Sequence, residues 1–227
     1  LYIFPFNIWL LLPTLIIGRI LKCKNKESKE NYLSICAIFK NEGLYLKEWI
    51  EYHLIVGVEH FYLYNNFSTD NYKEVLEDYI DSGAVTLIDW PIKHGQYPAY
   101  EDCLKKFSSK SQWIAFIDCD EFILPVKEKN LKNILNHYEL FPSYAAHWKM
   151  FGSSGNMSLE KDKLVTEKFI VCEEKINPFV KSFANTNWSM FLKVFQSHLI
   201  YAKIPFLKRV FPVMENYDFC LHLNNTN

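Results

Sequence analysis

The sequence predicts an α/β fold built on a mostly parallel sheet. Three strand-like runs are each followed by a segment of helical periodicity, and consecutive strand-then-helix units favour parallel strands joined by right-handed crossovers. A fourth apolar run, residues 113–117, leads directly into Asp118-Cys119-Asp120-Glu121. Because open α/β sheets bind ligands at the carboxyl ends of their strands, these observations predict a polar site at one edge of the sheet.

The individual elements follow from the spacing of apolar residues and from the glycines and prolines between them. The predicted strands of the first half are residues 32–39, 60–64, 85–88 and 113–117. Apolar stripes at helical spacing predict helices over residues 46–54, 72–80 and 100–107. After Pro125 the sequence predicts a short helix over 131–138 and strands over 144–151, 168–171 and 191–195.

Composition indicates one globular domain that acts on small molecules or glycans. The chain has 227 residues, is 49% hydrophobic and 17% aromatic, and carries a net charge of −1, which provides a core but no basic surface for nucleic acid. The six cysteines lack C-x-x-C spacing, so neither a zinc site nor a disulfide framework is expected.

The amino-terminal region differs from the rest of the chain. Residues 1–18 are uncharged and apolar, about the length of a helix that spans a bilayer, roughly 17–25 residues. The basic residues that follow favour a cytoplasmic domain by the positive-inside rule. We therefore expect a membrane anchor over residues 1–21, a linker over 22–31 and a domain over 32–227 that need not be complete at its carboxyl end. The alternative is an apolar segment packed on the domain.

Asp118 and Asp120 are the candidate metal ligands. Successive side chains of an extended chain alternate faces, so these two carboxylates point the same way. Like charges this close repel one another, whereas hard carboxylate oxygens suit Mg²⁺ or Mn²⁺, which in turn binds phosphate. The alternative is a solvated acidic loop after a strand. His198 follows a later strand and is either a third metal ligand or a structural histidine.

The loops after the four parallel strands supply candidates for binding a nucleotide. Glu42 can accept hydrogen bonds from a base or ribose, Asn66 and Asp70 can bind ribose hydroxyls, and Gln96 can face the base or phosphates. Asn66 and Asp70 also suit a turn and a helix N-cap. The donor-binding candidates are Lys40, Glu42, Asn66, Asp70, Gln96 and Asp118.

Aromatic and flexible residues later in the chain suggest a surface for a sugar acceptor. Trp148 precedes the loop Gly152-Ser153-Ser154-Gly155, and sugar rings stack on such aromatic faces. Burial in the core is the alternative for Trp148. Trp49 and His53 lie on the inner stripe of a predicted helix, where core packing with a hydrogen-bonded imidazole is expected.

Several segments together resemble glycosyltransferase family 92, formerly the domain of unknown function 23, and its relatives in the family 2 superfamily. The matching segments are Lys40-Asn41-Glu42, Glu48 to His53, Gly57 to Phe61, Tyr64 to Asp70, Trp90, Gln96 to Tyr100 and Trp113 to Pro125. The resemblance implies a Rossmann-like GT-A fold, a nucleotide-sugar donor, and Mn²⁺ or Mg²⁺ at Asp118 and Asp120. It also implies an acceptor-side role for residues 151–155. Lys181 matches a position that carries a positive charge in the family, and His198 matches a position near the metal.

The resemblance also bears on chemistry and location. It implies an inverting hexosyl transfer to a glycan or lipid-linked acceptor, as in polysaccharide biosynthesis, with a carboxylate base among Glu173, Glu174, Glu215 and Asp218. Eukaryotic members are Golgi-luminal type II membrane proteins, which four Asn-x-Ser/Thr sites would suit, whereas the basic flank favours a cytoplasmic domain. The competing functions are a sugar nucleotidyltransferase, whose usual Gly-rich phosphate loop is absent from the sequence after strand one, and an inactive glycan-binding relative.

Overall fold

The computed structural model describes residues 8–25, 28–126, 128–154, 163–174, 177, 179–195, 199–205, 208–210 and 212–213. Its first part contains α1 (Ile8–Lys24), β1 (Asn31–Phe39), α2 (Gly43–Ile55), β2 (His60–Asn65), α3 (Tyr72–Asp81), β3 (Val85–Asp89), α4 (Gln96–Phe107) and β4 (Ser111–Phe116). Its second part contains α5 (Leu131–Asn136), β5 (Ser143–His147), α6 (Val165–Lys168), β6 (Val180–Asn185), η1 (Thr186–Trp188), β7 (Leu192–Phe195), β8 (Leu199–Ile204) and β9 (Lys208–Val210).

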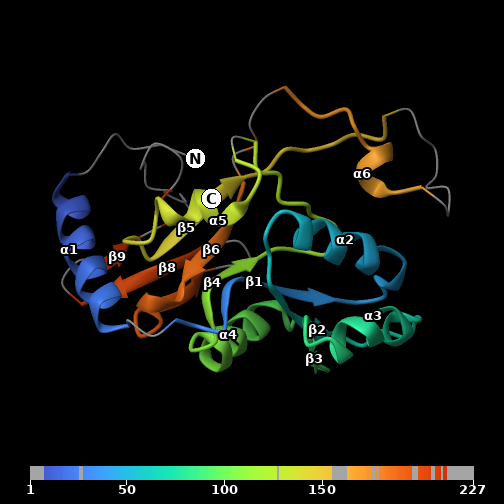
Figure 1. The fold of residues 1–227 in the computed structure, drawn as a ribbon, viewed down its shortest axis with the longest axis horizontal. Helices are drawn as coiled ribbons and strands as arrows, with labels where there is room; N and C mark the ends of the chain where they lie inside the picture. The colour runs from blue at the N-terminus through green and yellow to red at the C-terminus, as the bar shows by residue number, and fades with distance from the viewer. Residues whose placement is uncertain are drawn as a thin grey trace, which may run out of the picture.

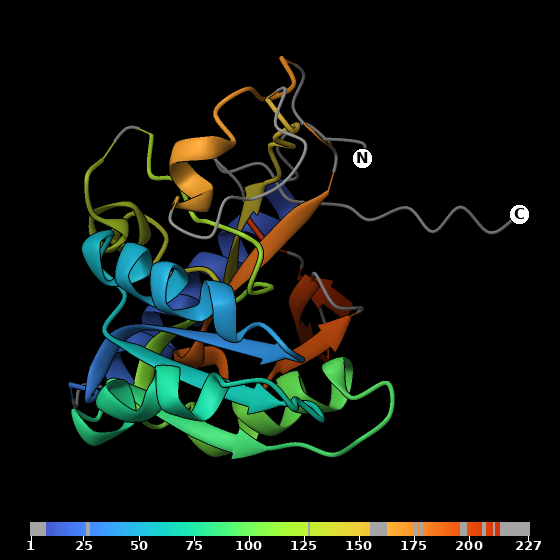
Figure 2. The same ribbon diagram turned by 90° about the vertical axis from the view of Figure 1, so that its right-hand side faces the viewer.

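The central sheet has the strand order β3-β2-β1-β4-β6-β5. The first four strands are parallel, whereas β6 pairs antiparallel with both β4 and β5. The arrowheads of β1, β2 and β3 point the same way in Figure 2, so the loops that follow them share one edge. The predicted α/β fold with a mostly parallel sheet is confirmed.

Helices cover both faces of this sheet. In a right-handed crossover, the face on which the helix lies depends on the direction in which the chain moves across the sheet. The chain moves one way from β1 to β2 and from β2 to β3, so α2 and α3 lie on the same face. It moves the opposite way from β3 to β4, so α4 lies on the other face. Helices α2 and α3 contact one another, and α4 packs on β1, β4 and β7. The apolar strand residues are buried between these layers, with Leu33, Ile35, Trp113 and Ile114 fully inaccessible to solvent. The continuous apolar runs therefore reflect strands that are covered on both sides.

The second half of the chain departs in part from the sequence prediction. The strand predicted over residues 144–151 ends at His147, and the strand predicted over 168–171 is wrong, because α6 ends at Lys168 and the next residues are irregular. The amides of Val165 and Thr166 both donate hydrogen bonds to the Glu48 carboxylate of α2. A carboxylate stabilises the first turn of a helix, and this one comes from too far along the chain for a local pattern to reveal it.

Helix α1 packs on the domain, at the opposite end of the molecule from α3 (Figure 1). Thr14 and Leu21 are buried, and Gly18 lies so close to Leu140 that an added Cβ would overlap the Leu140 carbonyl oxygen. Lys22 forms an ion pair with Glu139. Within the described residues no helix combines the length and the apolar character needed to cross a bilayer, so the anchor over residues 1–21 stays a prediction.

The substitution Gly18→Ala tests this packing. Although alanine favours a helix by about 1 kcal/mol over glycine, the clash with a backbone carbonyl should displace α1 and lower the free energy of unfolding by about 1–2 kcal/mol. Thermal denaturation measures the change. Ile16→Ala, at an exposed position of the same helix, should have a smaller effect, and equal or greater stability of Gly18→Ala would contradict the packing of α1.

Candidate functional site

The carboxyl edge of the parallel strands brings together loops that are distant in sequence. The side-chain oxygen of Asn41, in the loop after β1, accepts a hydrogen bond from the backbone amide of Thr69, and the backbone amide of Asn41 donates to Ser68 Oγ. Ser68 and Thr69 both lie in the loop after β2. Asn66 of that second loop donates through Nδ2 to the carbonyls of Trp90 (2.7 Å) and Ile92 (2.9 Å), after β3. The three loops are therefore linked by hydrogen bonds within the protein itself.

Each of these three loops contains one non-glycine residue in the left-handed region. The φ angles are 59° for Asn41, 60° for Phe67 and 52° for His94. Asparagine tolerates this region, but a bulky residue such as phenylalanine is rarely found there. Strained backbone of this kind is concentrated at functional sites, where the surrounding contacts impose it. The strained backbone therefore indicates a functional site at the same edge of the sheet as the polar side chains do.

A cavity of about 510 Å³ opens at this edge. Its size is within the range of small-molecule sites, roughly 300–1,000 Å³. It is lined by Ile38, Phe39, Lys40, Asn66, His94, Gly95, Gln96 and Tyr97. Three donor-binding candidates, Lys40, Asn66 and Gln96, thus line one hollow, although the Asn66 amide nitrogen is already engaged with the neighbouring loop.

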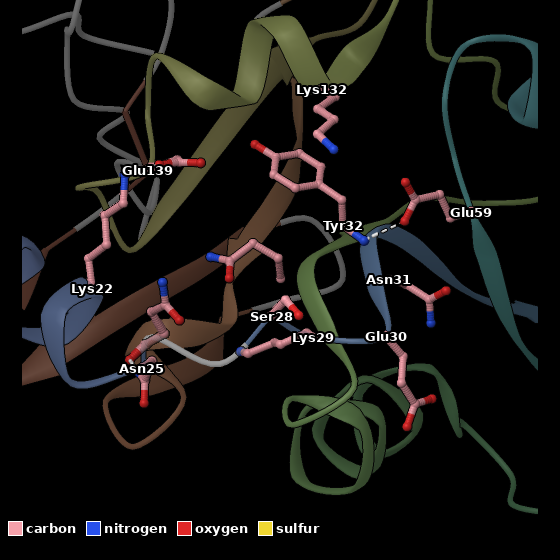
Figure 3. A pocket seen from close by; sticks show the side chains of 12 residues that line it. Lys22, Asn25, Ser28, Lys29, Glu30, Asn31, Tyr32, Glu59, Lys132 and Glu139 are labelled. Atoms are coloured by element: carbon pink, nitrogen blue, oxygen red, sulfur yellow. Dashed lines mark hydrogen bonds and ion pairs between the residues drawn. The ribbon is translucent and has the colours of Figure 1, made fainter.

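A second cavity, of about 560 Å³, lies at the opposite edge (Figure 3). Asn31 and Tyr32 at the start of β1, and Gln112 at the start of β4, line it together with lysines and glutamates. In Figure 3 the Tyr32 amide donates to the Glu59 carboxylate. None of the residues selected from the sequence lines this cavity, so the carboxyl edge is the candidate site.

Asp118 joins the carboxyl-edge cavity to the acidic segment after β4. Its Oδ1 accepts hydrogen bonds from Gln96 Nε2 at 2.7 Å and, more weakly, from the Tyr100 hydroxyl at 3.5 Å. Its Oδ2 lies 2.5 Å from Lys181 Nζ of β6. Gln96 is thus both a wall of the cavity and a direct partner of Asp118. The contact makes the cavity and the acidic segment one continuous site.

Glu121 completes a partly buried charge cluster with Asp118 and Lys181. Its carboxylate lies 3.1 Å from Lys181 Nζ and accepts the Asp118 amide at 2.9 Å. Burial raises the pKa of Glu121 to about 7, although the nearby ammonium of Lys181 opposes that rise. The Lys181 side chain is only 5% exposed, so its charge is screened little by solvent.

Asp120 lies beside this cluster and is exposed. Its charge and that of Asp70 both raise the pKa of Glu42, after the larger effect of partial burial. Asp70 accepts the Gly43 amide through Oδ2 at 2.7 Å, while its buried Oδ1 has no hydrogen-bond partner among the described residues. Glu42, Asp70 and Asp120 are therefore within electrostatic range of one another at the same edge.

The residues present suit a divalent cation only if further ligands arrive with it. Asp118 and Asp120 supply hard carboxylate oxygens, the donor type that Mg²⁺ and Mn²⁺ prefer. However, the described part of the chain contains no group of three or more His, Cys, Asp or Glu side chains placed to hold a metal, and Lys181 occupies one oxygen of Asp118. The donor set fits a cation that is held jointly with a phosphate-bearing ligand.

One face of α2 holds the backbone after the two aspartates in place. Trp49 Nε1 donates to the Glu121 carbonyl at 2.8 Å, and the Tyr52 hydroxyl donates to the Ile123 carbonyl at 3.1 Å. His53 Nδ1 bonds to the Trp49 carbonyl at 2.7 Å, and the Ile123 amide donates to His53 Nε2 at 3.2 Å. Both Trp49 and His53 are fully buried, so these residues pack in the core, as expected, and also fix the acidic segment.

The residues predicted to bind an acceptor are placed only in part. Trp148 is half-buried, with its ring 5.4 Å from Lys181 Nζ. Gly152 and Ser153 are exposed, while Ser154 Oγ accepts the amides of residues 170 and 171. Trp148 therefore connects the predicted acceptor side to the charge cluster.

The remaining predicted residues divide into two groups. Glu173 and Glu174 are exposed, and their carbonyls accept hydrogen bonds from Lys149 Nζ. Gly155, His198, Glu215 and Asp218 lie outside the described residues. His198 as a third metal ligand and the identity of the catalytic base accordingly stay predictions.

Sequence reasoning did not select several residues that contact the predicted site. In the sequence, Tyr100 is one residue of an apolar helical stripe and is expected only to pack in the core. In the structure it is fully buried, and its hydroxyl is also directed to Asp118. Glu121 reads as the end of an acidic run, and its contact with Lys181 requires β6 to lie beside β4. The sequence did offer one indication of such contacts, in α2. Trp49, Tyr52 and His53 recur there at helical spacing, and each carries a polar atom that needs a hydrogen-bond partner when it is buried.

The pH dependence of stability tests the hydrogen bonds of His53. Burial lowers its pKa to about 4, whereas an unfolded histidine titrates near 6.5. As pH falls through this window only the unfolded state gains the proton, so the free energy of unfolding should fall by up to about 3 kcal/mol. Urea denaturation at pH 7 and pH 4.5 should show a smaller loss for His53→Gln than for the wild type. His147→Gln, at an exposed position, is the control, and identical profiles for His53→Gln and wild type would contradict a buried neutral imidazole.

Comparison with known proteins identifies the family. The sequence profile of glycosyltransferase family 92 matches residues 29–227. A glycosyltransferase family 92 protein of Oryza sativa subsp. japonica is 30% identical over 173 residues, which is 68% of this chain and 29% of the relative. A beta-1,4-galactosyltransferase of Caenorhabditis elegans is 32% identical over 108 residues, which is 41% of this chain and 25% of that protein.

The solved structures and the relative lengths complete the comparison. Residues 1–349 of S. aureus TarS in complex with UDP align with a TM-score of 0.46 at 15% identity, over 69% of this chain and 47% of that one. The chain spans between 24% and 29% of the length of the first curated relatives that it matches. The match over residues 29–227 nevertheless includes every element from β1 onward, and the chain belongs to glycosyltransferase family 92.

Proposed function

We propose that this chain forms the donor-binding part of a GT-A glycosyltransferase, which moves a hexose from a nucleoside-diphosphate sugar to a glycan or lipid-linked acceptor. The single observation that carries the proposal is the contact of Asp118 with Gln96 at 2.7 Å. It joins a cavity of about 510 Å³ to a pair of carboxylates. A nucleotide sugar needs both features, a hollow for the nucleoside and an acidic segment where a cation can hold the diphosphate.

The cavity supports the nucleoside part of this proposal. Its walls combine the apolar Ile38 and Phe39 with the polar Asn66 and Gln96 and the cationic Lys40. Ligand sites in proteins commonly combine an apolar wall with a few convergent polar groups. In this arrangement the aromatic and aliphatic walls accept the base, while Gln96 lies between the nucleoside and the acidic segment.

The carboxylates support the diphosphate part. We propose that Asp120 and Asp118 hold Mn²⁺ or Mg²⁺ together with the donor diphosphate. The bound cation would neutralise the negative charge that develops on the leaving nucleoside diphosphate. The protein itself contributes the orientation of these carboxylates, because Trp49 and Tyr52 fix the backbone that follows them. The exposure of Asp120 leaves its carboxylate accessible to an arriving ligand.

The names of the relatives suggest a donor sugar to test first. One relative is a beta-1,4-galactosyltransferase, so we propose galactose as the transferred hexose and inversion at its anomeric carbon. Inversion requires a base that takes the proton of the acceptor hydroxyl as that oxygen attacks. The candidates are Glu173, Glu174, Glu215 and Asp218. NMR of the product linkage determines whether the anomeric configuration is inverted or retained.

The substitution Asp120→Asn tests the proposed function. Because the amide keeps the shape of the side chain but is a poor ligand for a hard cation, transfer or hydrolysis of the donor should fall by about 100-fold or more, with little change in stability at this exposed position. The measurements are a screen of common nucleotide sugars with Mn²⁺, and calorimetry of Mn²⁺ with UDP.

Asp81→Asn is the matched control, since Asp81 is an exposed carboxylate at the far end of α3. Unchanged affinity of Asp120→Asn for Mn²⁺ with UDP would remove the metal from this site. A wild-type protein that binds Mn²⁺ and UDP but turns over no donor, with or without added acceptors, would instead be an inactive binding relative.

A further inference from the structure

Lys181 places a buried cation directly on the proposed metal site. Its ammonium lies 2.5 Å from Asp118 Oδ2 and 3.1 Å from Glu121 Oε2. Its side chain is 5% exposed, and it lies under the Trp148 ring. The lysine comes from β6, the antiparallel neighbour of β4, where Phe116 pairs with Ser182. The next residue outward on β6 is therefore beside the end of β4.

This position has a direct consequence for a free divalent cation. Any cation that approaches Asp118 meets an ammonium already paired with that carboxylate. At the low effective dielectric of a partly buried site, repulsion between such charges weakens cation binding by about tenfold or more. Of the two proposed ligands only Asp120 remains without a cationic partner, and one carboxylate is a weak site for Mn²⁺ or Mg²⁺, which prefer about six oxygen ligands.

The arrival of a nucleoside diphosphate changes this balance. The diphosphate brings negative charge and oxygen ligands of its own, and that charge offsets the repulsion between the ammonium and the cation. Because linkage is reciprocal, a diphosphate that strengthens cation binding is itself bound more tightly when the cation is present. Glu121, at 3.1 Å, gives the Lys181 ammonium a second partner while the charges around Asp118 rearrange.

We propose that Lys181 is an internal counter-ion that weakens the binding of free metal at Asp118 and thereby makes metal binding depend on the donor diphosphate. This inference rests on the proposed function of the site. It assigns Lys181 a positioning role and requires no chemical step by the lysine. Its practical effect would be to keep the site free of cation until a donor arrives, so that metal and donor enter together.

The test is the thermodynamic coupling between Mn²⁺ and UDP. Calorimetry or electron paramagnetic resonance measures the affinity of the full chain for Mn²⁺ with and without UDP. The wild type should bind Mn²⁺ weakly alone and about tenfold or more tightly with UDP. In the double variant Lys181→Met/Glu121→Gln, Mn²⁺ alone should bind about tenfold more tightly than in Glu121→Gln, which differs from it only at the lysine, and the coupling to UDP should shrink.

The choice of variants separates this role from simple loss of structure. Removing Lys181 alone leaves two like charges close together, which can destabilise the fold. The double variant removes one charge of each sign, and the side-chain oxygen of Glu121→Gln can still accept the Asp118 amide. Lys181→Arg keeps the positive charge and should retain the coupling. Lys22→Met removes a lysine that is paired with Glu139 at the opposite edge and should leave both affinities unchanged.

Each outcome decides between the two proposals. If the folded double variant binds Mn²⁺ alone no more tightly than Glu121→Gln does, while the wild type binds Mn²⁺ and UDP cooperatively, the role of Lys181 is overturned and the proposed function stands. A wild type that binds neither UDP nor Mn²⁺ under any condition would overturn the proposed function and this inference together. Thermal denaturation of every variant establishes that each one is folded.

Discussion

The ion pair of Lys181 with Asp118 and Glu121 joins the two halves of this molecule at its candidate site. The carboxylates follow β4, whereas the lysine comes from β6, which pairs antiparallel with β4. An unpaired buried charge is costly, so the lysine and the carboxylates stabilise one another only when the two strands are in register. The site therefore depends on the antiparallel addition to the parallel sheet, and a shift of β6 would leave these charges unpaired.

The geometry of the cavity edge is established by the protein before any ligand binds. Hydrogen bonds from Asn41 and Asn66 link three loops, and Asn41, Phe67 and His94 keep left-handed backbone conformations within them. Such contacts reduce the ordering that a ligand would otherwise have to impose when it binds. Asn66 illustrates the division of roles, because its amide nitrogen holds neighbouring backbone while the residue also lines the cavity.

Helix α2 connects the two sides of the site. Its inner face fixes the segment after Asp120 through Trp49, Tyr52 and His53, and Glu48 on the same helix binds the first turn of α6. The donor side and the segment after the predicted acceptor loop thus share one rigid support. A shared support of this kind suits the proposed transfer, since transfer requires two substrates to be held in contact at a defined geometry.

The sequence by itself determined the parallel half of the fold and the place of the acidic pair. The features that predict them are local: apolar runs of strand length, apolar stripes at helical spacing between these runs, and a pair of aspartates two residues apart. Such patterns can be recognised in the sequence because each depends on the periodicity of a single element. The same reasoning located the loops after the strands, since parallel strands bring their carboxyl ends to one edge. The resemblance to family 92 came from the order and spacing of those same segments.

Only the tertiary structure decided which side chains complete the site. The strand predicted over residues 168–171 was wrong because the competing turn of α6 is stabilised by Glu48, more than 100 residues earlier in the chain. Tyr100 and Glu121 acquire their contacts from β4, α4 and β6, whose arrangement no local window contains. The resemblance marked Lys181 as a positively charged position, but only the antiparallel pairing of β6 with β4 shows that its charge lies against Asp118. Periodicity fixes which residues face inward along one element, but the partners of a buried charge are fixed by how separate elements pack.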